Sequence, residues 1–183
     1  CRLLNKVEPG SGICFAGMTE PFLNKDCSKM IRYAYEKGYK IHLDTTFQGA
    51  TIEDIDYIKE VKFSDLQFHI PDQERHSKFI IDESYLEVVE KAKELFPFNS
   101  YHCHGKVHSE VERYIEEQKV SYDLHDRAGN IKIECVNPSV KQGPIVCVGG
   151  SITVGSGSSP VLLPNGAVVR CCMDFGLRHV YGN

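Results

Sequence analysis

Length, composition and charge set the first limits on this chain. Its 183 residues are 42% hydrophobic, which suits one domain with a substantial core and a small appendage. A net charge of −4 offers no basic field to nucleic acid or to an anionic membrane surface. Because no apolar run approaches the ~20 residues of a spanning helix, we expect neither a membrane nor a nucleic-acid partner.

The eight cysteines bear on the compartment. In a secreted protein they could pair into disulfides. They are scattered through periodic sequence instead of being concentrated in a small loop-rich scaffold. We therefore expect a reducing, cytoplasmic compartment, in which some thiols are structural and others are metal ligands.

The periodic part of the chain opens with a strand that leads through a turn into a helix. Residues 13–16 form a short apolar run typical of a buried strand. The polar loop 17–21 follows, and a helix begins at an N-cap, Asn24 or Asp26, and ends at Gly38. Such a loop can present backbone groups to a ligand, although an ordinary strand–helix connection has the same composition.

Four more strands alternate with helices along the chain. We expect the strands at residues 39–46, 66–70, 98–104 and 120–125. The first helix between them is expected to begin at Thr51, which forms a capping box with Asp54, and the second at about Asp82. The third is expected to be capped by Ser109 and Glu112 and to end near Gln118.

This alternation predicts a parallel sheet with helices outside it, either doubly wound or part of a barrel. In both cases the carboxyl ends of the strands gather at one edge, where ligands bind. Polar residues occupy these ends: Glu20, Thr45, Thr46, His69, Asp72, His102, His104, His125, Asp126 and Arg127. They predict a polar-lined cavity.

The character of the sequence changes at Asp126, so we divide the chain into residues 1–126 and 127–183. Two β-like runs, at 145–148 and 167–170, flank a glycine-rich loop that lacks the Gly-Lys-Ser/Thr ending of a phosphate-binding loop. A Pro-Asn-Gly turn predicts a hairpin that presents Cys171. Cys147 and Cys171 are therefore candidate soft-metal ligands, the alternative being two small buried hydrophobic residues.

Three segments resemble a known superfamily. Residues 16–24, Ala-Gly-Met-Thr-Glu-Pro-Phe-Leu-Asn, resemble the Gly-Gly-Glu-Pro region of radical SAM enzymes, which holds the amino group of S-adenosylmethionine in that superfamily. Residues 126–130 and 163–176 resemble members with a SPASM-type auxiliary cluster domain. The Gly-x4-Cys element of that domain is matched by Gly166 and Cys171, and Cys147 lies where its first cysteine would be.

The resemblance implies a fold, an activity and a set of site residues. The fold would be a partial (β/α)6 open TIM-like barrel lacking its first strand–helix unit, followed by a small C-terminal β-rich SPASM-like segment. The activity would be reductive cleavage of S-adenosylmethionine at a 4Fe–4S cluster to a 5′-deoxyadenosyl radical that modifies a peptide or small molecule. An electron donor such as flavodoxin or ferredoxin, and an auxiliary cluster, are implied as well. The implied cofactor-binding residues are Gly17, Thr19, Glu20, Pro21, Thr46 and His69, and the implied metal ligands are Cys1, Cys147 and Cys171.

The departures from the family pattern keep other hypotheses open. The 183 residues contain no CxxxCxxC triplet, of which Cys1 would be the last member, and the later SPASM cysteines are missing too. We therefore expect a truncated or internally deleted piece that does not cleave S-adenosylmethionine by itself. One alternative is a catalytically silent α/β scaffold that binds a ligand or partner. Another is a zinc site formed by His102, His104 and His108.

Overall fold

The computed structural model describes residues 7–16, 19–122, 160–163, 165–169, 177 and 180–182. The chain divides into two units, residues 1–123 and 124–183, which are described separately below. The boundary predicted between residues 126 and 127 lies outside the described residues and stays a prediction.

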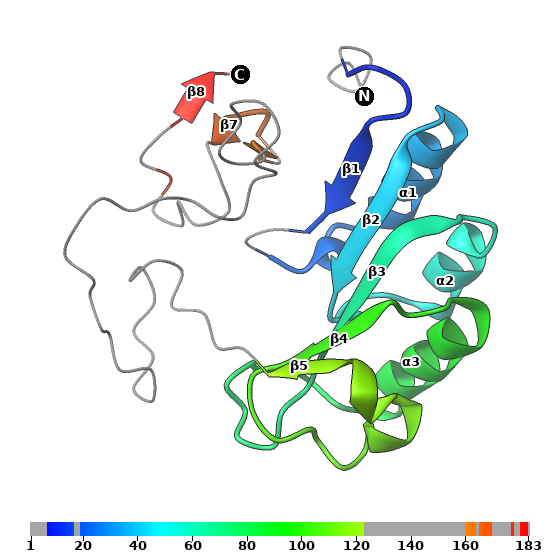
Figure 1. Cartoon of the computed structure of the whole chain (residues 1–183), viewed down its shortest axis with the longest axis vertical. Coiled ribbons are helices and arrows are strands. Elements are labelled where there is room, and N and C mark those ends of the chain that lie inside the picture. The colour runs from blue at the N-terminus through cyan, green and yellow to red at the C-terminus, as the bar shows by residue number, and fades with distance from the viewer. Residues whose placement is uncertain are drawn as a thin grey trace. The chain divides into compact units, whose positions relative to one another are not determined.

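The first unit contains a five-stranded parallel sheet in which the strands lie side by side in chain order (Figure 1). The strands are β1 (Gly12–Phe15), β2 (Lys40–Thr45), β3 (Phe63–Ile70), β4 (Ser100–Cys103) and β5 (Val120–Tyr122). All four neighbouring pairs are parallel. The predicted parallel α/β fold is therefore confirmed, and each strand lies where the alternation of apolar residues placed it.

Three α-helices connect these strands and lie on the same face of the sheet (Figure 1). They are α1 (Cys27–Glu36), α2 (Ile52–Ile58) and α3 (Glu83–Leu95), with the 3-10 helix η2 (Pro21–Leu23) ahead of α1. The capping box of α2 is present, because Thr51 Oγ1 accepts from Asp54 N at 3.2 Å while Thr51 N donates to Asp54 Oδ2 at 3.1 Å. Asp82 begins α3 as expected and accepts from Tyr85 N at 2.9 Å.

The helix predicted from Ser109 to about Gln118 is wrong. Two short 3-10 helices, η3 (Glu112–Tyr114) and η4 (Glu117–Lys119), occupy this segment. Between them Ile115 has extended backbone angles, φ −111° and ψ 142°, while the preceding Tyr114 is buried. Few apolar residues support a helical face here, and Val111, at the start of η3, makes no side-chain cap bond. Packing of Tyr114 against the core therefore outweighs local helix propensity.

The two faces of the sheet differ in chemistry. The face beneath the helices is apolar and buried, and its largest members are Ile41, Leu43, Leu66, Phe68, Ile70 and Tyr101. The opposite face is polar, and its residues pair across neighbouring strands: Cys14 with His42, Asp44 with Gln67, His69 with His102, and His102 with Ser121. Such alternation is typical of a sheet that packs helices on one face only. In the part of the chain that the structure describes, the second helical layer of a doubly wound sheet is not seen.

The second unit contains a three-stranded antiparallel sheet of β6 (Val161–Leu162), β7 (Val168–Val169) and β8 (Val180–Gly182). Gly166 has φ +88° in the turn between β6 and β7, and Asn165 Oδ1 accepts from Ala167 N at 3.0 Å. The predicted hairpin is thus confirmed at its turn and its two paired strands, whereas Cys171, which it was expected to present, lies outside the described residues. The run at 145–148 and the glycine-rich loop lie outside the described residues.

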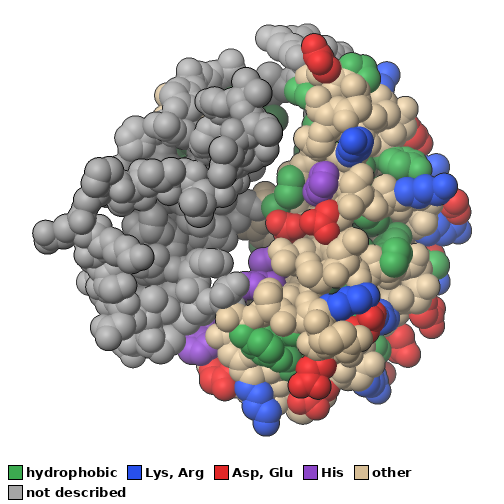
Figure 2. Space-filling view, in the orientation of Figure 1, with side chains coloured by type: hydrophobic (Ala, Val, Ile, Leu, Met, Phe, Trp, Pro, Cys, Tyr) green, Lys and Arg blue, Asp and Glu red, His purple; other side chains and the backbone are tan. Residues whose placement is uncertain are grey.

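Charged side chains of both signs are mixed on the face of the described part that Figure 2 shows. Figure 2 shows Lys and Arg side chains interspersed with Asp and Glu, with neither sign gathered into one patch on the visible face. Among the described helices, none has the length and apolar character needed to cross a membrane.

Candidate functional site

The loop that follows β1 meets the end of β2 at the carboxyl edge of the sheet, and Glu20 joins them. Its Oε1 atom accepts hydrogen bonds from Phe22 N at 3.1 Å and from Thr45 Oγ1 at 2.6 Å. Its Oε2 atom accepts from the backbone N and the Oγ1 of Thr46, both at 2.6 Å. Four donors therefore fix the orientation of one carboxylate. We call these residues, Glu20 with Thr45 and Thr46, the Glu20 clamp.

The local sequence explains how the clamp forms. Pro21 restricts the residue before it to extended backbone, and Glu20 accordingly has φ −63° and ψ 125° at the start of η2. At the end of β2, Phe47 turns the chain with φ +59°, and its N donates to Thr45 Oγ1 at 2.8 Å. A buried aromatic residue in the left-handed region costs about 1–3 kcal/mol, so packing has to maintain it. The Phe47 ring lies between 5.4 and 6.0 Å, centroid to centroid, from the rings of Phe22, Phe68 and Phe98.

The negative charge of Glu20 acts on two neighbouring acidic groups. Burial, and then Glu20, raise the pKa of the Tyr85 hydroxyl, which donates to Thr46 O at 3.1 Å. Burial also raises the pKa of Cys27 to about 12, and Glu20 and Asp54 add to this effect. Both groups are therefore neutral near physiological pH, and the Cys27 thiol is neither a reactive nucleophile nor a ready metal ligand. A fixed negative charge among neutral groups suits a cationic ligand, such as an ammonium group.

Histidines gather on the polar face of the sheet. His69 and His102 occupy paired positions on β3 and β4, with ring centroids 5.1 Å apart. His104 follows β4, and its ring centroid lies 4.7 Å from that of His102. On β2, burial and then the charge of Asp65 raise the pKa of Asp44, while His42 opposes the shift.

The structure brings together some of the predicted site residues and not others. Glu20, next to Pro21 in the loop after β1, is hydrogen-bonded to Thr46 at the end of β2, and Thr19 is exposed in the same loop. His69 lies on the polar sheet face beside His102 and takes no part in the four hydrogen bonds that hold Glu20. The predicted Gly17, Cys1, Cys147 and Cys171 lie outside the described residues.

One described group has ligand atoms at metal-binding spacing. Atoms of Asp72, Glu74 and His76 lie within 4.8 Å of one another. The oxygens of Asp72 already accept from His76 N at 2.8 Å and Ser77 N at 3.2 Å, and Glu74 Oε2 accepts from Lys106 N at 2.9 Å. These carboxylates therefore build the loop after β3. Among the described residues, His102, His104 and His108, which were considered as an alternative zinc site, do not form such a group.

The described cysteines do not fit an iron–sulfur cluster. Burial raises the pKa of both Cys27 and Cys103, which keeps them as thiols, and Cys14 is exposed on another strand. No cysteine belongs to a group with ligand spacing in the described ranges. A cluster would need about four thiolate ligands, which these residues do not supply.

The polar sheet face was not predicted from the sequence. The signal was present, because His42 and Asp44 alternate with Ile41 and Leu43 along β2. Only the strand pairing shows that the polar positions of all five strands fall on one face.

Comparisons of this chain with protein-family models, with curated proteins and with solved structures found no match. The functional argument therefore rests on the chemistry of the described residues. Its two main features are the Glu20 clamp and the polar face of the parallel sheet.

Proposed function

We propose that this chain is part of a radical SAM enzyme with a SPASM-type auxiliary domain, and that the Glu20 clamp forms its S-adenosylmethionine site. The observation that carries the proposal is the clamp itself, a Gly-x-x-Glu-Pro loop held by four hydrogen bonds at the carboxyl edge of a parallel sheet. The sheet is then a section of a partial (β/α)6 open TIM-like barrel, whose interior is the polar face. The second unit is the SPASM-like segment, in which Cys147 and Cys171 would share an auxiliary metal centre.

The clamp binds and orients. Because four donors already engage the carboxylate of Glu20, we assign it no proton transfer; it fixes the loop and supplies a negative field for the amino group of S-adenosylmethionine. His69 and His102, on the polar face, contribute to the wall of the cavity.

The iron–sulfur cluster, when bound, would supply the electron that cleaves the cofactor. The described residues do not fit this cluster, so we assign no step of the cleavage to them. Binding in this superfamily has two anchors, the cluster iron and the loop, and of these the described residues supply only the loop. Loss of a chelating metal removes several kcal/mol of binding free energy, and each ~1.4 kcal/mol corresponds to a tenfold change in affinity.

The experiment is a nuclear magnetic resonance titration of the 183-residue chain with S-adenosylmethionine. We expect millimolar binding that shifts the backbone amides of Thr19, Glu20, Phe22 and Thr46, the residues of the loop and the clamp. Glu20→Gln should abolish these shifts. The matched control, Glu90→Gln, removes an equal charge from an exposed position on α3 and should leave them unchanged. Shifts confined to other residues, or equal binding by all three proteins, would contradict the proposal.

A second candidate is a catalytically silent α/β scaffold that binds a ligand or partner. The observation in its favour is that no described cysteine is placed for cluster binding. The same titration separates the two candidates, because a scaffold unrelated to radical SAM chemistry has no reason to bind S-adenosylmethionine at the Glu20 clamp.

A further inference from the structure

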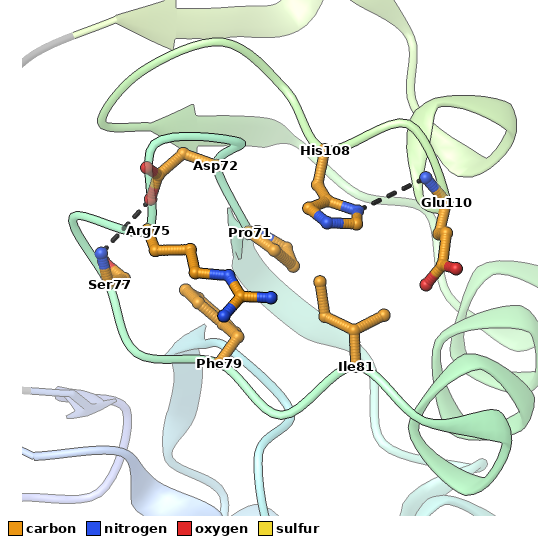
Figure 3. Close-up of a pocket in the computed structure, with 8 residues that line it drawn as sticks. All are labelled: Pro71, Asp72, Arg75, Ser77, Phe79, Ile81, His108 and Glu110. Carbon is orange, nitrogen blue, oxygen red and sulfur yellow. Dashed lines mark hydrogen bonds between the residues drawn. The ribbon is translucent and has the colours of Figure 1, made fainter.

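We propose that a pocket beside the carboxyl ends of β3 and β4 binds a small monocarboxylic acid with an apolar body. The cavity has a volume of about 310 Å³. That volume lies at the lower end of the range of about 300–1,000 Å³ for small-molecule sites. It is lined by Pro71, Asp72, Arg75, Ser77, Phe79, Ile81, His108 and Glu110 (Figure 3). This pocket is separate from the Glu20 clamp, and the proposal does not depend on the proposed function.

The two loops that form the pocket are joined by backbone hydrogen bonds. His108 N donates to Pro71 O at 3.0 Å, and Gln73 N donates to Lys106 O at 2.8 Å. The side chain of Glu74 adds a third link by accepting from Lys106 N at 2.9 Å. Because the walls are already ordered, a ligand does not have to order them, and less binding free energy is lost.

Arg75 supplies the charge that recognises the ligand. Its guanidinium points into the space between Phe79, Ile81 and His108 (Figure 3). Within the described ranges no carboxylate lies at ion-pair distance from it. Asp72 also lines the cavity, but both of its oxygens accept backbone hydrogen bonds from the loop. The planar fork of an arginine matches the two oxygens of a carboxylate.

The backbone of Arg75 is set for this position. Its φ is +57°, in the left-handed region that non-glycine residues seldom adopt. The conformation follows a turn in which Arg75 N donates to Asp72 O at 3.2 Å. Unusual backbone of this kind concentrates at binding sites, where the surrounding structure holds it in place.

His108 supplies a second donor. Its Nδ1 atom accepts from Glu110 N at 3.4 Å, which leaves Nε2 as the ring nitrogen that donates to a ligand. Pro71, Phe79 and Ile81 form the apolar part of the lining, and the ring centroid of Phe79 lies 6.5 Å from that of Tyr85. The carboxylate of Glu110 adds a negative charge to the lining, which disfavours a dianion such as phosphate. The chemistry selects a monoanion with an aromatic or branched aliphatic body.

Benzoate is the probe for this site, in a nuclear magnetic resonance titration of the 183-residue chain. We expect millimolar binding that shifts the amides of residues 72–81 and 107–110. Benzamide, which has the same shape without the charge, should bind at least about tenfold more weakly, since its charge-assisted hydrogen bonds are lost. Inorganic phosphate should bind more weakly than benzoate. Equal binding of benzamide, tighter binding of phosphate, or shifts only outside these residues would overturn the proposal.

Two substitutions in the same loop provide a matched comparison. Arg75→Asn removes the positive charge, and asparagine tolerates the positive φ of this position. Lys78→Asn removes an equal charge from an exposed position that does not line the pocket. We expect benzoate affinity to fall about tenfold in Arg75→Asn and to stay within about twofold in Lys78→Asn. Arg75→Lys, which keeps the charge without the fork, should lie between them. Unchanged affinity in both Arg75 variants would overturn the assignment.

Discussion

Glu20 illustrates how one side chain can position a loop instead of transferring protons. Its carboxylate links the loop after β1 to the last residues of β2 through the two neighbouring threonines. Burial, and then the same charge, raise the pKa of Cys27 and of Tyr85. One residue thus sets both the geometry and the electrostatics of the loop.

Glu20→Gln is expected to destabilise the protein by about 1.5–3 kcal/mol, the range for hydrogen bonds to a charged group. In glutamine an NH2 group replaces one of the two carboxylate oxygens. Because this group is itself a donor, it cannot accept the hydrogen bonds that the replaced oxygen now accepts. Urea unfolding measures the change. Glu90→Gln should change the free energy of unfolding by less than about 0.5 kcal/mol, as is usual for exposed positions. Equal effects of the two substitutions would show that the clamp does not stabilise the fold.

At the scale of single residues, the sequence predicts which residues lie at the site but not which contacts they make. Glu20, Thr45 and Thr46 are recognisable because they are polar residues at strand ends. Their pairing depends on the left-handed conformation of Phe47, which no local pattern indicates. That conformation is maintained by rings from distant parts of the chain, so only the folded structure reveals it.

At the scale of elements, local signals succeed where burial agrees with them. The capping residues of α2 and α3 and the alternation in β2 predict those elements, and buried apolar residues of the same elements, such as Leu43, Ile55 and Val88, hold them against the core. The segment after β4 shows the opposite case. There Glu116 pairs with Lys93 of α3 at 2.7 Å and with Lys119 at 2.8 Å. These tertiary contacts accompany two short 3-10 helices where local capping signals predicted one α-helix.

The Glu116 pairs should make stability depend on acid pH. Hydrogen bonds from Lys119 and Lys93 lower the pKa of Glu116 from 4.5 to about 2. The folded state favours the ionised carboxylate, so the Glu116 pairs contribute fully to the free energy of unfolding when the pH is above the ordinary pKa of 4.5. This contribution is lost as the pH falls toward the lowered pKa of about 2. Urea unfolding across this interval should show a shallower pH dependence for Glu116→Gln than for the unmodified protein. Glu94→Gln, an exposed control on α3, should retain the full dependence, and parallel curves for all three would contradict the prediction.

At the scale of the whole molecule, the parallel α/β fold was predictable because strand and helix patterns alternate at the spacing of strand–helix units. Predicting which residues lie on each face of the sheet requires the pairing register of the strands, because a shift by one residue moves every side chain to the opposite face. The metal-ligand predictions involve Cys1, Cys147 and Cys171, which lie outside the described residues, and they stay predictions.

The 183-residue chain is expected to yield no 5′-deoxyadenosine from S-adenosylmethionine. Reductive cleavage needs an electron delivered through a cluster, and no protein side chain substitutes for it. The chain is incubated anaerobically with iron, sulfide, reductant and S-adenosylmethionine, and the product is measured by chromatography. A radical SAM enzyme of known activity, carried through the same procedure, controls for the reagents. Product above the protein-free background would contradict the expectation.

The strand order of the sheet has a consequence for how the protein forms. Each strand pairs with the strand next to it in the chain, so Ile13 aligns with Ile41, Leu43 with Leu66, and Phe68 with Tyr101. Every addition closes a loop of comparable length, and the entropy of closure varies only slowly with that length. The sheet can therefore assemble one strand–helix unit at a time as the ribosome releases the chain, without waiting for a strand synthesised later to be inserted between two earlier ones.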